Sequence, residues 1–159
     1  MALKTAVITV SDRCSRGEKE DLSGPAVARL SAEKGLDVIY ASVVPDEKEE
    51  IKKELIKCSD ALHADIVLTT GGTGFSKRDV TPEATMDVIE REAPFIPEAM
   101  LFYSLKITPN AMLSRMKAGI RGDTVIINLP GSPKAATENL GAVIDTFPHA
   151  VKMLHGEGH

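Results

Sequence analysis

The sequence of 159 residues contains little that could recognise a nucleic acid or cross a membrane. It has no Trp, only four Phe and two Tyr, and a formal charge of −4 at pH 7. So few aromatic rings provide no stacking platform for bases, and a net negative charge gives no general attraction to phosphate backbones or anionic lipids. No run approaches the ~20 apolar residues that a membrane-spanning helix needs. The composition therefore argues against both kinds of partner.

Cysteine is equally scarce. Cys14 and Cys58 form no C-x-x-C pair and no zinc ligand set, and isolated thiols fit a reducing cytosol better than a secreted, disulfide-built chain. At the N-terminus, the apolar run of residues 6–10 is too short to be a signal peptide. We therefore expect a cytoplasmic protein.

The length is ordinary for one domain, and no repeat or flexible linker divides it. We therefore expect a single domain over residues 1–159. Four compact apolar runs rich in β-branched residues predict strands that are covered on both faces: residues 5–10, 37–44, 65–70 and 124–129. Residues 111–113, which precede Gly122-Asp123, could add a strand that pairs antiparallel with the last of these.

Helical periodicity fills the gaps between the predicted strands. Apolar residues recur at intervals of 0, +4, +7 and +11 in two segments, first at Ile51, Leu55, Cys58 and Leu62, then at Ala136, Leu140, Val143 and Phe147. Shorter helical patterns surround residues 27–30 and 85–89. This alternation of strands and helices predicts an α/β fold, a three-layer sandwich with a mainly parallel sheet flanked by helices.

Each predicted strand ends in a turn of small or polar residues. In a parallel sheet the four turns share the carboxyl edge, where open α/β proteins bind ligands. Free backbone N–H groups and helix N-termini at that edge favour an anion, above all a phosphate. The four turns are Ser11-Asp12, Pro45-Asp46, Gly71-Gly72-Thr73-Gly74 and Pro130-Gly131-Ser132-Pro133.

Some of these turns also have a purely structural explanation. Asp46 with Glu49 matches a helix capping box, and Thr81-Pro82 and Ser132-Pro133 are typical of helix starts. The glycine run is harder to explain in this way, because each glycine costs roughly 0.5–1 kcal/mol in chain entropy relative to Ala. Close approach of a ligand to the backbone would account for it. Neither the Walker P-loop pattern nor G-x-G-x-x-G is present.

The histidines lie away from these turns. His63 precedes a predicted strand, and the other three are in the last eleven residues. Chemistry without a histidine base, such as phosphoryl or nucleotidyl transfer, is therefore favoured. Asp46 and Asp79 could hold Mg²⁺ beside a phosphate, and Lys77 and Arg78 follow the glycines closely enough to reach one.

The segment Thr-Gly-Gly-Thr-Gly-Phe-Ser-Lys-Arg-Asp-Val-Thr-Pro-Glu at residues 70–83 resembles the MogA-type molybdopterin adenylyltransferases of molybdenum cofactor biosynthesis. The likeness covers nearly the whole chain. Its second half, residues 78–83, points to the adenylyltransferase branch, since MoaB-type paralogues can carry the glycines without it. Other matching segments are residues 10–12, 44–46, 104–109, 111–115, 118–122 and 129–131.

The resemblance implies an α/β trimer that transfers AMP from ATP to the terminal phosphate of molybdopterin and releases pyrophosphate. It implies that Asp46 and Asp79 are catalytic and hold Mg²⁺, and that the product is handed over to a molybdate-inserting enzyme. Ser114 would lie near the product. The remaining ligand-binding positions would be Ser11, Asp12, Thr70, Gly71, Gly72, Thr73, Gly74, Pro130, Gly131 and Ser132.

Two other interpretations remain open. The same scaffold could serve a non-catalytic molybdopterin-binding or carrier protein, or a structural oligomer whose crevice is unused. An unusually apolar segment at residues 95–105 bears on oligomerisation, and core burial or a subunit interface explains it equally well.

Overall fold

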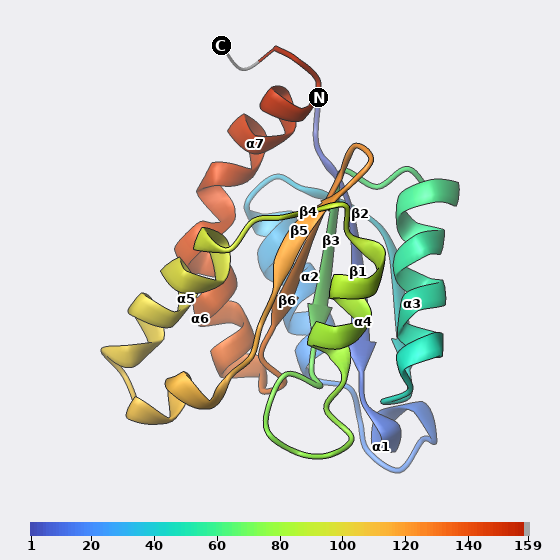
Figure 1. Ribbon diagram of the computed structural model, residues 1–159, viewed down its shortest axis with the longest axis vertical. Helices are drawn as coiled ribbons and strands as arrows, with labels where there is room; N and C mark the ends of the chain where they lie inside the picture. The colour runs from blue at the N-terminus through green and yellow to red at the C-terminus, as the bar shows by residue number, and fades with distance from the viewer. Residues whose placement is uncertain (158–159) are drawn as a thin grey trace.

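One six-stranded sheet forms the centre of the molecule, a computed structural model that describes residues 1–157 (Figure 1). The strand order is β2-β1-β3-β6-β5-β4. Four neighbouring strands are parallel, namely β2 (Asp37–Val44), β1 (Lys4–Val10), β3 (Ile66–Thr70) and β6 (Thr124–Leu129). Two shorter strands, β5 (Ala118–Arg121) and β4 (Arg91–Glu92), extend the sheet in antiparallel pairing.

Helices cover both faces of this sheet and give the three layers that the sequence predicts. One face packs against α2 (Ser23–Glu33), α5 (Phe95–Leu105), α6 (Pro133–Val143) and α7 (Phe147–Leu154). The other face packs against α3 (Lys48–Ile56), a π-helical turn η1 (Lys57–Ala61) and α4 (Thr81–Val88). The short segments are α1 (Asp12–Ser15) and the 3₁₀ helices η2 (Pro109–Leu113) and η3 (Ile144–Thr146).

Successive side chains of each central strand enter the two opposite cores. In β1, Val7 packs on the α2 side, whereas Ala6 and Ile8 pack on the α3 side. The strand is buried on both faces because helices cover both, which is why its sequence is continuously apolar instead of alternating. The two helical patterns of the sequence analysis are also confirmed: Ile51 and Leu140, one from each pattern, are fully buried.

Two details of the sheet differ from the sequence prediction. The antiparallel strand exists, but it is β5, which turns at Gly122-Asp123 into β6, while residues 111–113 lie in η2. Strand β2 is not covered on both faces: it is an edge strand, and Ile39 and Val43 are 39% and 40% exposed. Its apolar composition resembles that of a central strand, and sequence alone does not reveal which strand has only one neighbour.

The N-termini of the helices show which of the turn residues cap a helix. Ser132 is the N-cap of α6 and accepts the N–H of Ala135 at 3.2 Å, as predicted. The capping box at Asp46 is wrong, because α3 begins at Lys48 and Asp46 makes no bond to its first turn. Thr81 is the first residue of α4, not its cap, and its hydroxyl donates to the Gly71 carbonyl at 2.9 Å.

The strand order places a crevice between β1 and β3. The chain leaves β1 through α2 on one face to reach β2, then returns through α3 on the other face to reach β3. Such a reversal leaves the carboxyl edge open between the two strands. The N-terminus and the last helix, α7, lie at the opposite end of the molecule (Figure 1). Within residues 1–157, no helix is both long and apolar enough to span a bilayer.

A buried asparagine ties three elements together beside this crevice. The Asn128 amide donates to the hydroxyls of Thr69 and Thr85, and its oxygen accepts the N–H of Lys117. Asn128→Ala is expected to lower the free energy of unfolding by about 1–3 kcal/mol, because it leaves the buried partners unpaired. Urea unfolding measures the loss. The exposed Asn110→Ala is the control, and an equal, small effect of both variants would contradict the prediction.

Candidate functional site

A cavity of about 390 Å³ opens at the carboxyl edge of the sheet. All four turns that follow the parallel strands contribute to its wall. This volume lies within the usual range for small-molecule sites. The residues of the wall that the sequence analysis named are Ser11, Asp46, Thr70, Gly71, Gly72, Asp79, Gly131, Ser132 and Pro133.

The glycine loop, residues 71–80, follows β3 along one side of the cavity. Gly71 and Gly72 have φ values of +103° and +70°, which side chains rarely adopt. A Cβ at Gly71 would collide with the Val10 carbonyl, and one at Gly72 with the Thr81 hydroxyl. These two glycines are therefore required by contacts within the chain, whereas the sequence analysis ascribed them to the approach of a ligand.

The same loop brings a backbone N–H to the cavity wall at Gly72. The N–H of Gly71 donates to the Leu129 carbonyl at 3.2 Å. Within residues 1–157, the N–H groups of Gly72, Thr73 and Gly74 have no protein acceptor. Free amides on a loop with left-handed residues form the kind of concave donor set that binds anions.

Two helices and a neighbouring turn complete the positive side of the cavity. The N-termini of α2 and α6, each 11 residues long, reach its wall with Ser23 and Ser132. The Thr70 hydroxyl donates to the Pro130 carbonyl at 2.6 Å, which fastens the end of β3 to the turn before α6. The partial positive charge of helix N-termini favours an anion here.

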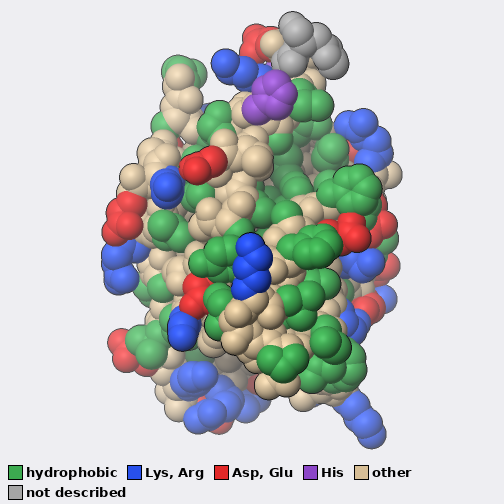
Figure 2. Space-filling view, turned by 90° about the vertical axis from the view of Figure 1, so that its left-hand side faces the viewer, with side chains coloured by type: hydrophobic (Ala, Val, Ile, Leu, Met, Phe, Trp, Pro, Cys, Tyr) green, Lys and Arg blue, Asp and Glu red, His purple; other side chains and the backbone are tan. Residues whose placement is uncertain are grey.

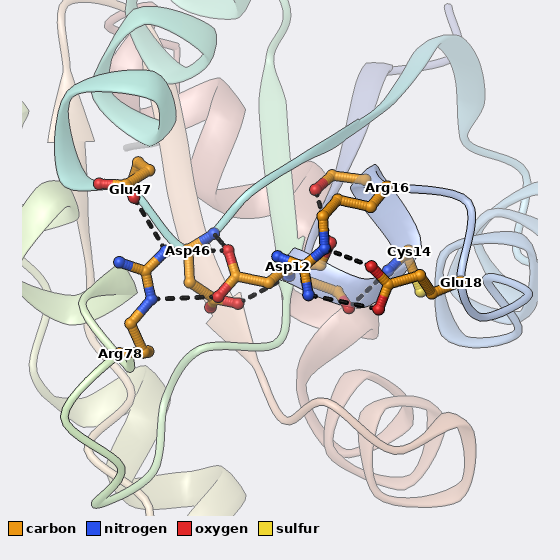
Figure 3. Close-up of polar contacts among 9 residues, drawn as sticks. Asp12, Cys14, Arg16, Glu18, Asp46, Glu47 and Arg78 are labelled. Carbon is orange, nitrogen blue, oxygen red and sulfur yellow. Dashed lines mark hydrogen bonds and ion pairs between the residues drawn. The ribbon is translucent and has the colours of Figure 1, made fainter.

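Two aspartates from different turns bind each other through the backbone. The N–H of Asp12 donates to Asp46, and the N–H of Asp46 donates to Asp12, both at 2.9 Å (Figure 3). This reciprocal pair joins the turns after β1 and β2. It explains why Asp46 does not cap α3: its carboxylate faces the neighbouring turn.

Arg78 spans the loops next to this pair. Its guanidinium donates twice to Asp12, at 3.0 and 3.1 Å, and once to Glu47 at 2.9 Å (Figure 3). The hydrogen bonds from Arg78 lower the pKa of Asp12, despite partial burial, and the two carboxylates raise the pKa of Arg78. Arg78 is therefore engaged with protein carboxylates, and Lys77 beside it is exposed and outside the cavity wall.

Asp46 is in a less favourable environment for its charge. Burial raises its pKa, and the negative charges of Asp12 and Asp79 raise it further, against the opposing effect of the Asp12 N–H and Arg78. Perturbed carboxyl groups of this kind cluster at functional sites.

The donor chemistry at Asp46 and Asp79 fits a hard cation. The Asp79 carboxylate accepts the N–H of Ser76 at 3.1 Å, and within residues 1–157 one oxygen of each aspartate accepts no hydrogen bond. Among these described residues, no group of three His, Cys, Asp or Glu side chains could hold a metal by itself. Mg²⁺ commonly binds one or two carboxylates and completes its shell with water and phosphate oxygens.

A second cavity of about 220 Å³ contains two of the remaining predicted residues, whereas Asp12, Thr73, Gly74, Lys77 and Arg78 line neither cavity. Ser114 and Pro130 line it, so Pro130 and Gly131 mark a boundary between the two cavities. Among the described residues, the buried Ser114 hydroxyl and the amide oxygen of Asn139 have no hydrogen-bond partner, and both residues line this cavity. Such buried polar atoms are rare in native proteins and suggest a missing partner.

Two groups of residues near the site were not predicted from the sequence. Lys19 and Asp21 line the main cavity from the segment before α2, where Asp21 accepts the Gly24 N–H at 3.0 Å. The acidic Asp21, shortly before Gly-Pro, is a pattern typical of a helix N-terminus and could have predicted the start of α2 here. Arg115 was also missed. Its side chain donates hydrogen bonds to the carbonyls of Gly74 and Asp79, which are 36 or more residues away in the sequence. A local sequence pattern cannot predict such a contact.

The histidines lie away from the main cavity, as the sequence indicated. Of the described residues, His63 and His155 line a separate hollow of about 660 Å³ near the N-terminus of β1. His159 lies outside the described residues. The wall of the main cavity thus contains backbone amides, carboxylates, hydroxyls, the Cys14 thiol and Lys19, and it contains no described histidine.

These features define an α/β domain with a cavity at the point where its strand order reverses. A family described as the probable molybdopterin binding domain matches residues 6–149, and the chain belongs to this family.

Named relatives resemble the chain over nearly its whole length. A molybdopterin adenylyltransferase of Helicobacter pylori (strain 26695) is 46% identical over 152 residues, which cover 94% of this chain and 86% of that protein. That of Escherichia coli K12 is 39% identical over 97% of this chain and 86% of that protein. The crystal structure of the molybdopterin biosynthesis enzyme MoaB from Thermus thermophilus is similar with a TM-score of 0.91, at 44% identity and 97% coverage of both chains.

The raised pKa of Asp46 predicts a pH-dependent cost in stability. Above the ordinary value of 3.8, the folded protein keeps a proton that the unfolded chain has released, so stability falls as the pH rises through the folded pKa. Asp46→Asn retains an oxygen for the Asp12 N–H and removes this cost. Its Tm, measured in EDTA, is expected to exceed the wild-type Tm at pH 8 by more than at pH 4. The exposed Asp123→Asn is the control, and an equal difference at both pH values would contradict the prediction.

Proposed function

We propose that this protein is a molybdopterin adenylyltransferase, an enzyme of molybdenum cofactor biosynthesis formed by one molybdopterin-binding domain over residues 1–159. It transfers AMP from ATP, bound with Mg²⁺, to the terminal phosphate of molybdopterin and releases pyrophosphate. The observation that supports this proposal most directly is that Ser11, Asp46, Gly72 and Gly131, from four different turns, line one cavity. The chain that forms this cavity is 46% identical to a protein named for this activity.

The reaction suits a site without histidine. An oxygen of the molybdopterin phosphate attacks the α-phosphorus of ATP, and the bond from that phosphorus to the bridging oxygen of the β-phosphate breaks. The leaving pyrophosphate takes the electron pair. A phosphate monoester with a second pKa near 6 is largely ionised at pH 7, so the nucleophile needs no protein base. Positioning and charge neutralisation supply most of the catalysis.

The protein groups on the cavity wall have distinct tasks in this proposal. Gly72 and Gly131 present backbone to the phosphates, and the α6 N-terminus at Ser132 adds its partial positive charge. Lys19 lines the cavity, and we assign to it the stabilisation of the leaving pyrophosphate because it is the one Lys or Arg of the described residues on that wall. Arg78 could assist only after it exchanges Asp12 and Glu47 for phosphate.

Asp46 and Asp79 would hold the Mg²⁺ that accompanies ATP, since in the described part of the chain each keeps a carboxylate oxygen free of hydrogen bonds. The bound ion would supply positive charge to the phosphate oxygens. This pairing would also relieve the repulsion that Asp79 exerts on Asp46.

Ser114 is proposed to contact molybdopterin from the second cavity. Its buried hydroxyl has no hydrogen-bond partner among residues 1–157, and the cavity walls are mostly apolar. A substrate that reaches past Pro130 from one cavity to the other would satisfy that hydroxyl while its phosphate lies among the glycines.

We further propose that the protein acts in the cytoplasm and hands its product to a molybdate-inserting enzyme. The free thiols of Cys14 and Cys58 are compatible with a reducing compartment. A non-catalytic carrier of molybdopterin is the alternative, and it predicts tight binding without release of pyrophosphate.

Replacing Asp79 separates the enzyme from the carrier. Asp79→Asn is expected to fold normally and to slow pyrophosphate release, with ATP, Mg²⁺ and purified molybdopterin, by at least about a hundredfold, or ~2.7 kcal/mol of barrier. EDTA should abolish release by the wild type. Asp123→Asn, in the exposed turn between β5 and β6, is the control. Near-normal turnover of Asp79→Asn would remove this residue from the mechanism, and an inactive wild type that binds molybdopterin would favour the carrier.

A homotrimer is the proposed assembly, and an exposed apolar surface supports it. The segment at residues 95–105 divides in the structure: Met100 is buried, whereas Phe95 and Phe102 are 78% and 71% exposed. Met112 and Leu113 of η2 add further exposed apolar area. Figure 2 shows hydrophobic side chains gathered on this side of the molecule. We define this surface by Phe95, Phe102, Met112 and Leu113; apolar patches of this kind commonly mark interfaces.

Sedimentation tests this assembly. The wild type is expected to sediment at three times the 17.0 kDa chain mass, and Phe102→Glu is expected to shift it toward the monomer because a charge would be buried at the contact. Met86→Glu, on the exposed side of α4, is the control and should leave the trimer intact. A monomeric wild type at micromolar concentration would refute the proposal.

A further inference from the structure

The glycine loop has few bonds of its own to define its shape. Within the loop, the N–H of Asp79 donates to the Ser76 carbonyl at 3.0 Å and the Asp79 carboxylate accepts the Ser76 N–H. The loop contains three glycines, which lose more conformational freedom on ordering than other residues. A segment of this kind needs support from elsewhere to hold one conformation.

Arg115, which follows η2, provides that support through three loop carbonyls. Its backbone N–H donates to Thr73 at 2.8 Å, its Nε to Gly74 at 2.8 Å, and one terminal nitrogen to Asp79 at 2.7 Å. Its other terminal nitrogen pairs with Glu83 of α4 at 2.6 Å. The guanidinium thus connects residues 74 and 79 of the loop to the helix that follows it.

We propose that Arg115 is a positioning residue for adenylyl transfer, which sets the Asp79 carboxylate at the cavity wall by fixing the loop backbone. The proposal rests on the function proposed above. Arg115 does not line the main cavity, so it acts through Gly74 and Asp79. Misplacement of a reacting group by about 1 Å can cost a hundredfold in rate.

The geometry requires a guanidinium and not merely a positive charge. Three separate nitrogens serve acceptors in different directions, a set that the planar fork of Arg can satisfy and the single ammonium of Lys cannot. Arg115→Lys therefore keeps the charge near Glu83 and the backbone bond to Thr73, but it cannot reproduce both side-chain contacts to the carbonyls of Gly74 and Asp79.

Arg121 provides a matched control. It also binds one carboxylate, Asp60, and one carbonyl, that of Val88, and its side chain is 25% exposed against 34% for Arg115. Neither Asp60 nor Val88 lines the main cavity. A general loss of stability would affect the two variants alike, whereas a positioning role affects only one.

Steady-state kinetics and hydrogen exchange test the inference. Arg115→Lys is expected to lower kcat for pyrophosphate release by at least about tenfold, with a smaller change in the KM for ATP, and to speed amide exchange in residues 72–79. Arg121→Lys should change neither quantity by more than about twofold. Glu83→Gln should retain most of the activity, because the three carbonyl contacts remain.

Each outcome separates the inference from the proposed function. A wild type that releases no pyrophosphate would refute the function, while exchange in residues 72–79 would still show whether Arg115 orders the loop. An active wild type with Arg115→Lys as fast as Arg121→Lys would overturn the inference. A Glu83→Gln variant as slow as Arg115→Lys would also overturn it, because the ion pair with α4 would then be the important contact.

Discussion

The position of the site follows from one constraint, the reversal of strand order between β1 and β3. The helices that leave these neighbouring parallel strands pass to different faces of the sheet, so no connection covers the carboxyl edge between them. The turns after β1, β2, β3 and β6 must therefore surround an opening. Short contacts, such as Thr70 to Pro130 and Gly71 against Val10, then fix the turns to one another. The cavity is a consequence of the fold, and its chemistry depends on which residues occupy the turns.

Those residues bring groups of opposite charge preference to the same cavity. Backbone amides and two helix N-termini favour an anion, yet Asp12, Asp46 and Asp79 bring negative charge to the same region. Burial raises the pKa of Asp46, and the charges of Asp12 and Asp79 raise it further. A metal–nucleotide complex carries both signs of charge and can satisfy both sets of groups. The site is therefore better suited to a phosphate that arrives with a cation than to a bare anion.

Local patterns in the sequence predict much of this arrangement. The central strands and the packed faces of α3 and α6 could be read from runs and periodicities, because each records burial by neighbouring elements. The strands β4 and β5 were missed or misplaced because two and four residues are too few for a periodic signal. The hydrogen-bond partners of Asp46, Arg78 and Arg115 could not be predicted from local patterns, because these bonds join residues that are 31 to 66 positions apart in the sequence. The predicted capping box at Asp46 is an example. The local pattern paired Asp46 with the start of α3, whereas in the structure its carboxylate accepts the N–H of the distant Asp12.

The pairing of Arg78 with Asp12 and Glu47 has a consequence for ionic strength. The Arg78 guanidinium is already neutralised by the carboxylates of Asp12 and Glu47, so few mobile counterions gather around it. A polyphosphate that bound Arg78 would displace these two carboxylates and not solvent anions. Few solvent ions would be released at that position. Nucleotide affinity should then depend less steeply on salt than the number of basic side chains near the cavity would suggest, because the protein supplies its own competitor.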